Sequence, residues 1–276
     1  MCDSAQLASE RIILTGAEGR HATTVRRLAP GERVDLTDGA GLLAECVVVA
    51  VRPGELDLTV LARRSEPEPS RRVVVVQAIL KGDRGELAVE LMTEVGVDAI
   101  VPWAAERCVA RWRPDRADRA LSRWRSTARE AAKQSRRLRF PELAEQAQTA
   151  QVVDLVTAAD LAVLLDPAAA DSLATVLLPL CGEEPQRLPD ALPSRSCHDV
   201  VLIVGPEGGI SQAESAALIA AGAAPARLGP SVLRGSTAGA VAGALVLSRC
   251  GRWDQPDGCG PLSSALGRRG GRLGRS

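Results

Sequence analysis

The stretch VVLIVGPEGGISQAE, residues 200–214, contains a strand, a glycine-rich loop and the start of a helix in direct succession. Residues 200–204 form an apolar run typical of a buried strand, and Ser211-x-x-Glu214 is a capping box that starts a helix. Glycines between a strand and a helix allow close backbone approach to a ligand, so residues 205–209 predict a binding loop. The loop has neither the lysine of a P-loop nor the spacing G-x-G-x-x-G, and it therefore suits a nucleoside-like ligand better than a triphosphate. A plain tight turn is the alternative.

A second loop, LGPSVLRGSTA at residues 228–238, runs into a helix made almost entirely of small residues. Glycine inside a helix costs roughly 1 kcal/mol relative to alanine. Gly239 and Gly243 therefore indicate a helix that is crowded by neighbouring backbone. The alternative is an ordinary small-residue core helix in an alanine-rich chain.

Outward from these loops, the chain changes character near residue 70. Residues 1–66 contain short strands and turns, which predict a compact β-barrel, and residues 65–70 form a polar linker with two prolines. From residue 71 to 253, apolar strands alternate with helices, which is typical of a mostly parallel α/β sheet covered on both sides. We expect a Pro-rich surface loop at residues 185–196 and a disordered Gly- and Arg-rich tail at residues 254–276.

Composition narrows the classes of function. Hydrophobic residues make up 46% and charged residues 25% of the 276 residues, as in an ordinary globular protein. Aromatic residues make up 2%, too few for RNA readers that stack successive bases on rings. We find no apolar run of roughly 18 residues and no signal peptide, and we expect a cytoplasmic protein without a membrane span. Seven cysteines without a C-x-x-C pair, and only two histidines, argue against disulfide frameworks, metal sites and His-based triads; Cys197 beside His198 is interpreted as a chance pair.

Positive charge is concentrated in one segment, although the formal net charge is zero. Residues 107–139 hold eleven Arg and one Lys against three acidic residues. Spacings near three and four gather many of these side chains on one helix face, and the planar fork of arginine suits phosphate. The stripe indicates a polyanionic partner, with a solvated helix face as the alternative.

The two loops together resemble the C-terminal half of SPOUT RNA methyltransferases, whose chain forms a trefoil knot that binds S-adenosylmethionine. More narrowly, the order of motifs resembles the RsmE family, which methylates N3 of a uridine in 16S rRNA. The matching pieces are residues 21–41, QAILKGDRGELAVELMTEVGVDAIVP at 77–102, REAAKQSRR at 129–137, GPEGG at 205–209 and LGPSVLR at 228–234. The resemblance implies a PUA-like β-barrel over residues 1–66 and a SPOUT α/β domain with a C-terminal knot over residues 71–253.

The resemblance also implies S-adenosylmethionine as the cofactor. The residues expected to bind it lie in both loops and at the ends of two strands: Leu165, Val204, Gly205, Gly208, Gly209, Leu228, Gly229, Ser231, Val232 and Leu233. Arg234 is the candidate catalytic cation beside the uracil oxygens, with a phosphate clamp as its alternative role. Glu207 is the second catalytic candidate, as a hydrogen-bond acceptor for cofactor or substrate, or else as a carboxylate that stabilises its loop.

The resemblance implies contacts to RNA phosphates from Arg129, Lys133 and Arg137 on the basic helix, with Arg26 and Arg27 contributing from the barrel. The expected partner is 16S rRNA or the small ribosomal subunit. The expected assembly is a homodimer, and no metal is expected.

Two segments depart from the family pattern, and two other functions stay open. Residues 235–238 read Gly-Ser-Thr-Ala where Thr-Glu-Thr-Ala often follows the arginine, so no role of that glutamate is carried over; Arg136 stands where glycine is frequent. One alternative is a SPOUT ribose 2′-O-methyltransferase acting on tRNA or rRNA, against which the barrel and residues 129–137 argue. The other is a non-catalytic, RNA-binding ribosome-assembly factor, against which the intact loops argue.

Overall fold

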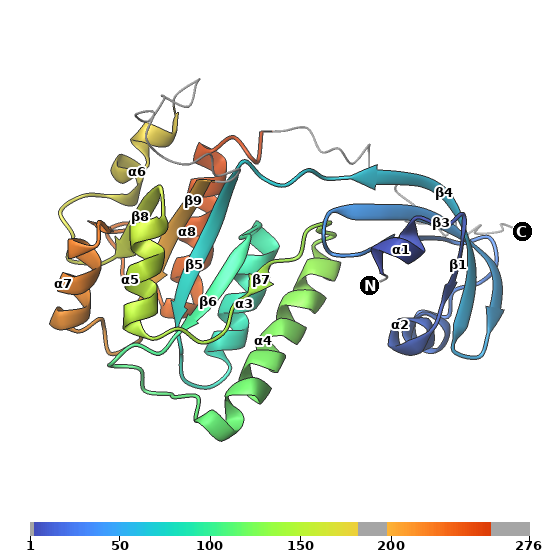
Figure 1. Ribbon diagram of the computed structural model, residues 1–276, viewed down its shortest axis with the longest axis horizontal. Coiled ribbons are helices and arrows are strands. Elements are labelled where there is room, and N and C mark those ends of the chain that lie inside the picture. Colours follow the sequence, from blue (N-terminus) through green and yellow to red (C-terminus); the bar gives the residue numbers. More distant parts are fainter. Residues whose placement is uncertain (1–2, 182–197, 255–276) are drawn as a thin grey trace, which may run out of the picture.

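The computed structural model describes residues 3–181 and 198–254, which form two sheets with separate cores (Figure 1). A small antiparallel sheet forms the N-terminal unit. A larger parallel sheet with helices on both faces forms the remainder of the described chain.

The N-terminal unit is a four-stranded antiparallel sheet with the strand order β1-β4-β3-β2. In the described residues its outer strands β1 and β2 do not pair with each other. Ile12 and Leu14 of β1 alternate with exposed residues and share a core with Leu56 and Leu58 of β4. The elements of this unit are α1 (Ser4–Leu7), β1 (Arg11–Leu14), α2 (Gly16–Arg20), a π-helix (His21–Val25), β2 (Arg33–Thr37), β3 (Leu42–Arg52) and β4 (Glu55–Ser65).

The larger sheet has six parallel strands in the order β10-β8-β9-β5-β6-β7. Its central strands are continuous apolar runs because both of their faces are covered by helices. The strands are β5 (Arg71–Ala78), β6 (Ala99–Trp103), β7 (Glu142–Leu143), β8 (Leu161–Leu165), β9 (His198–Val204) and β10 (Ala224–Ala226).

Helices cover the two faces of this sheet in separate layers (Figure 1). One layer consists of α3 (Arg84–Val95), α4 (Pro114–Gln134) and α8 (Gly235–Arg249), and the other of α5 (Thr149–Ala158) and α7 (Gln212–Ala220). The short α6 (Leu173–Val176) and a 3-10 turn (Leu178–Cys181) follow β8. Because parallel strands end at the same edge, all the loops after the strands gather there.

Helix α8 is crowded, as its glycines predict, but by side chains of α3 and the loop after it rather than by backbone. A Cβ added at Gly239 would lie 2.8 Å from the Sδ atom of Met92. One added at Gly243 would lie 2.9 Å from a methyl group of Val97. The small residues therefore bring α8 close against α3.

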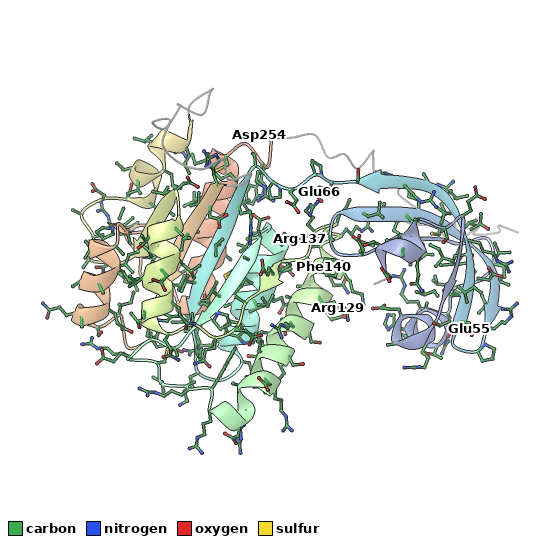
Figure 2. The ribbon with its side chains drawn as sticks, viewed as in Figure 1. Glu55, Glu66, Arg129, Arg137, Phe140 and Asp254 are labelled. Atoms are coloured by element: carbon green, nitrogen blue, oxygen red, sulfur yellow. The ribbon has the colours of Figure 1, made fainter. Side chains whose placement is uncertain are left out.

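The two units meet where α4 ends. The backbone N–H of Gly41 donates to the Leu138 carbonyl (3.0 Å), and the N–H of Phe140 donates to the Gly39 carbonyl (2.8 Å). The Arg139 guanidinium donates to the carbonyl of Glu66 in the linker. Figure 2 shows Phe140 and Arg137 at the end of α4 nearer the small sheet.

The structure confirms the α/β class and the parallel sheet expected from the sequence. The sequence prediction missed α5 and β7 of the larger sheet, and the short helices of the N-terminal unit. The Pro-rich loop at residues 185–196 lies outside the described residues, as does the tail except for Asp254. The knot depends on the path of the connection between β8 and β9, which includes residues 182–197, and it stays a prediction.

Candidate functional site

A cavity of about 640 Å³ opens at the carboxyl ends of the strands of the larger sheet. Loops that follow β8, β9 and β10 supply most of its wall. The β5–α3 connection supplies Leu80, and the first residue of α3 supplies Arg84. In an open α/β sheet this edge is the usual place for a ligand. The two loops singled out from the sequence therefore meet at one site.

Nine of the expected cofactor-binding residues line this cavity: Leu165, Val204, Gly205, Gly209, Leu228, Gly229, Ser231, Val232 and Leu233. Gly208 is not among the lining residues. A Cβ at Gly208 would lie 2.9 Å from the Arg107 carbonyl oxygen, so this glycine lets the loop approach the segment after β6. Its neighbour Gly209 has a φ of 73°, a left-handed conformation that favours glycine.

Glu207 faces the cavity but also anchors its loop. Its Oε1 atom accepts a hydrogen bond from the Lys81 backbone N–H (3.1 Å) and lies 3.7 Å from the Arg84 guanidinium. The carboxylate thereby ties the glycine loop to the start of α3. This geometry favours the loop-stabilising interpretation of Glu207 over the catalytic one.

Arg234 lines the cavity at the N-terminus of α8. Its backbone carbonyl accepts hydrogen bonds from the N–H groups of Thr237 and Ala238, both at 2.9 Å. The helix start is therefore stabilised by the backbone of Arg234 and not by its side chain. The side chain is exposed, and no hydrogen bond or ion pair holds it within the described part of the chain. The guanidinium is thus available to a ligand.

Glu214, the last residue of the predicted capping box, joins three segments below the cavity. Its Oε1 atom accepts from the Glu106 N–H (2.9 Å) and the Thr149 hydroxyl (2.8 Å), while Oε2 accepts from the Ser211 N–H (3.2 Å). Burial by itself would raise the pKa of Glu214, but these hydrogen bonds to the ionised form outweigh it and hold the pKa below its usual range. The sequence predicted the helix cap but not the other two partners.

Arg137, predicted to contact RNA, is instead committed to the protein. Its guanidinium donates to the carbonyls of Thr93 (3.0 Å) and Val97 (2.8 Å) at the end of α3, and its side chain is 13% exposed. Burial lowers the pKa of Arg137 to about 10, partly offset by Asp98 at 4.0 Å. We therefore propose a structural role for Arg137 in place of a phosphate contact.

Lys133 is also engaged, since its Nζ atom lies 3.3 Å from Glu18 of the small unit and 3.1 Å from Glu130. This ion pair joins the two units and leaves the ammonium group little free charge for RNA. The pair with Glu130 has the i,i+3 spacing of a helix face, but the contact with Glu18 was not visible as a sequence pattern because Glu18 lies more than a hundred residues away.

The remaining predicted RNA contacts lie on the small unit or beside it. Arg26 and Arg27 are exposed after the π-helix, and Arg27 has a φ of 51°. Arg129 lines a cleft of about 590 Å³ between α4 and residues 38–40 of the small unit, together with Phe140. Figure 2 shows Arg129 toward the same end of α4 as Arg137, away from the loops that form the first cavity.

Sequence reasoning missed several residues of the cavity wall: Leu80, Arg84, Asp166, Pro167, Ile210, Ser215, Ala226, Gly235 and Ala238. Asp166 directly follows β8, and its position after a buried strand was the signal that would have found it. Arg84 and Leu80 carry no such signal, because the wall they form depends on how α3 packs.

Two findings bear on other kinds of site. The described residues contain no group of His, Cys, Asp and Glu side chains that would hold a metal ion. None of the described helices is long and apolar enough to cross a membrane.

The fold and the cavity define an α/β protein that binds a nucleoside-like ligand at the carboxyl edge of a parallel sheet. Comparisons with known proteins narrow this class. A family model described as RNA methyltransferase domain matches residues 66–247, and one described as RNA methyltransferase PUA domain matches residues 14–61.

Relatives named ribosomal RNA small subunit methyltransferase E, from Mycobacterium bovis and Mycobacterium tuberculosis, are 45% identical over 242 residues, which is 88% of this chain and 88% of theirs. The chain belongs to the ribosomal RNA small subunit methyltransferase E family. The structure of such a protein from Neisseria gonorrhoeae, bound to S-adenosyl methionine, is 25% identical with a TM-score of 0.71, covering 86% of this chain and 91% of that one. A Legionella pneumophila protein with bound SAM is 26% identical with a TM-score of 0.72, over the same shares of the two chains.

Proposed function

We propose that this protein uses S-adenosylmethionine to methylate N3 of a specific uridine in the 16S rRNA of the small ribosomal subunit. The observation that carries the proposal is the meeting of nine expected cofactor residues in one cavity with Arg234 at its wall. Relatives named for this activity, at 45% identity over most of the chain, support it.

The cavity fits the proposed cofactor chemically. Apolar side chains such as Leu165 and Leu228, together with glycine backbone, suit an adenosine and a methionine chain. The carboxylate of Asp166 in the same wall complements a ligand with positive charge, whereas that of Glu207 is paired with Arg84. When bound, the cofactor supplies an activated methyl group on a sulfonium.

The protein's part in the reaction is to position the uracil, exclude water and ease the loss of the N3 proton. Correct placement of two reactants supplies on the order of 7–11 kcal/mol in favourable cases. The free guanidinium of Arg234 is the group we assign to the uracil oxygens, where it stabilises the charge that develops as N3 is deprotonated.

The proposal extends to organisation and partners. We assign residues 1–66 to a PUA-like RNA-binding domain and residues 71–253 to the methyltransferase domain, divisions supported by the family matches at 14–61 and 66–247. Arg26, Arg27 and Arg129 are the assigned contacts to rRNA outside the cavity. The protein acts as a homodimer in the cytoplasm, where its ribosomal substrate is found.

The test is methyl transfer from labelled S-adenosylmethionine to small subunits from a strain that lacks this gene, with mass spectrometry of the digested nucleosides. The expected product is 3-methyluridine. A ribose-methylated nucleoside would assign the protein to the 2′-O-methyltransferases instead. Absence of transfer, with a melting temperature that the cofactor does not move, would leave an RNA-binding assembly factor.

A further inference from the structure

The first half of α4 carries a row of arginines on one flank. Arg116, Arg119 and Arg123 are spaced by three and four residues, so their side chains share one side of the helix. Asp115 lies four residues before Arg119 and adjoins it on the same side of the helix, while Asp118 lies on the neighbouring side. The three arginines still outnumber the two acidic residues in this half of the helix.

The arginine flank lies beside the start of α3, which borders the cavity through Arg84. Arg123 lies 3.7 Å from Glu86 in the first turn of α3, and Arg84, two residues earlier, lines the cavity. A Cβ at Gly85 would lie 2.9 Å from the ring of Trp124, so α4 packs directly on the start of α3 at this point. Figure 1 shows this end of α4 beside the loops at the carboxyl edge of the sheet.

Arg107, in the loop between β6 and α4, is a further exposed cation beside the glycine loop. The backbone of Arg107 lies directly against Gly208 of the glycine loop, and its side chain is exposed. The loop is fixed in place because the N–H of Glu106 donates to Glu214. Arg107 therefore lies between the glycine loop and α4.

These guanidinium groups are free to bind a ligand. Over residues 3–181 and 198–254, no hydrogen bond or ion pair involves the side chain of Arg107, Arg113 or Arg119. Arg116 lies 3.6 Å from Asp115, but the two side chains are 76% and 69% exposed, and such surface pairs are weak. By contrast, Lys133 and Arg137 beyond the middle of α4 are held by the protein.

We infer that the RNA backbone beside the target uridine binds along this flank, with phosphates at Arg107, Arg116 and Arg119. The inference rests on the proposed function and moves the main phosphate contacts from residues 129–137 to the first half of α4. Guanidinium forks bind phosphate oxygens in pairs and release counterions as they do so. The flank contacts the phosphates of the RNA and not its bases. Its function is to hold the RNA strand while the target uracil enters the cavity.

The test is Arg116→Gln combined with Arg119→Gln in the full-length protein. We expect the Michaelis constant for small subunits to rise about tenfold or more, while kcat at saturating subunits stays near the wild-type value. In direct binding to the subunit, the slope of log affinity against log salt concentration should fall by about 1.4, for two lost phosphate contacts on single-stranded RNA. Affinity for S-adenosylmethionine should be unchanged, which also shows that the variant is folded.

Two controls give the result its meaning. Arg116→Lys with Arg119→Lys keeps the charge and should restore most of the salt slope. Arg249→Gln removes one such charge from the end of α8, outside the proposed RNA contacts, and should leave the Michaelis constant unchanged. A wild-type constant and slope in the first variant would overturn the inference, as would an equal loss in the second control. If the wild-type protein binds subunits but transfers no methyl group, the proposed function fails while the binding comparison still tests the flank.

Discussion

Charged side chains are buried and hydrogen-bonded at one edge of the parallel sheet, and largely exposed at the other. At the amino edge, Asp98 accepts hydrogen bonds from the Val73 N–H and from Arg252, and Arg137 lies beside it. At the carboxyl edge, Arg107 and Arg234 are exposed, and their side chains make no hydrogen bond or ion pair within the described residues.

Arginine therefore has a different role at each of the two edges. Buried and hydrogen-bonded, an arginine replaces backbone partners that α3 lacks at its end, and it holds the fold together. Exposed beside a cavity, it keeps its charge available for a ligand. Sequence position alone does not separate the two cases, because Arg107 and Arg137 belong to the same basic segment.

The largest expected effect comes from Arg137→Ala at the amino edge. Carbonyls of Thr93 and Val97 and the carboxylate of Asp98 would lose a buried partner, so we expect the free energy of unfolding to fall by about 3 kcal/mol. Urea denaturation measures this, with cofactor affinity of the folded fraction as the control. A loss below about 1 kcal/mol would mean that water replaces the guanidinium.

Arg234→Ala at the carboxyl edge should have the opposite pattern, with a large loss of activity and little loss of stability. Removal of one group that stabilises developing charge typically lowers kcat by about 10²–10³-fold. The exposed side chain should contribute less than about 0.5 kcal/mol to stability. Single-turnover methyl transfer and thermal melting check the two halves. A raised Michaelis constant for the subunit with normal kcat would support the phosphate clamp instead.

Glu214 is the exception at the carboxyl edge, a buried carboxylate with several partners, and it predicts a pH dependence. Its pKa is lower in the folded than in the unfolded protein, so its stabilisation is complete above the ordinary glutamate pKa and is lost as pH falls through the folded value. Unfolding of wild type and Glu214→Gln should therefore differ most near neutral pH and converge in acid. A difference that grows in acid would contradict the assignment.

The smallest effect is expected at Arg136, which ends α4 in a left-handed conformation with a φ of 57°. Glycine adopts this conformation without strain but has a more flexible unfolded chain. Arg136→Gly should therefore stabilise the protein by about 0.5 kcal/mol, measured as a small rise in melting temperature. Arg136→Ala retains the strain and should bring no gain, which makes it the matched control.

Much of the cavity could be predicted from the sequence because each of its loops is contiguous. GPEGG and LGPSVLR each indicate a binding loop within a few consecutive residues. Loops that follow parallel strands lie at the same edge of the sheet, so the sequence also predicts that these two loops meet. Gly208 lies outside the cavity lining because it faces Arg107, a contact between distant segments that the sequence does not show.

What the sequence left out depends on distant partners or weak local signals. The engagement of Lys133 and Arg137 involves Glu18 and the end of α3, and nothing near either residue indicates it. Helix α5 was missed because it starts after Gln148, an uncommon cap, and ends without glycine. Local pattern predicts elements and loops well, but not which charges neutralise one another.

Helix α4 joins the two units and also fixes their separation. Its 21 residues extend about 30 Å at a rise of 1.5 Å per residue, from the loops around the cavity to the backbone hydrogen bonds with the small sheet. If RNA binds at both ends of α4, as the proposed contacts of Arg116 and Arg129 imply, it must extend over most of that length. An oligonucleotide shorter than this span would then make only one of the two contacts.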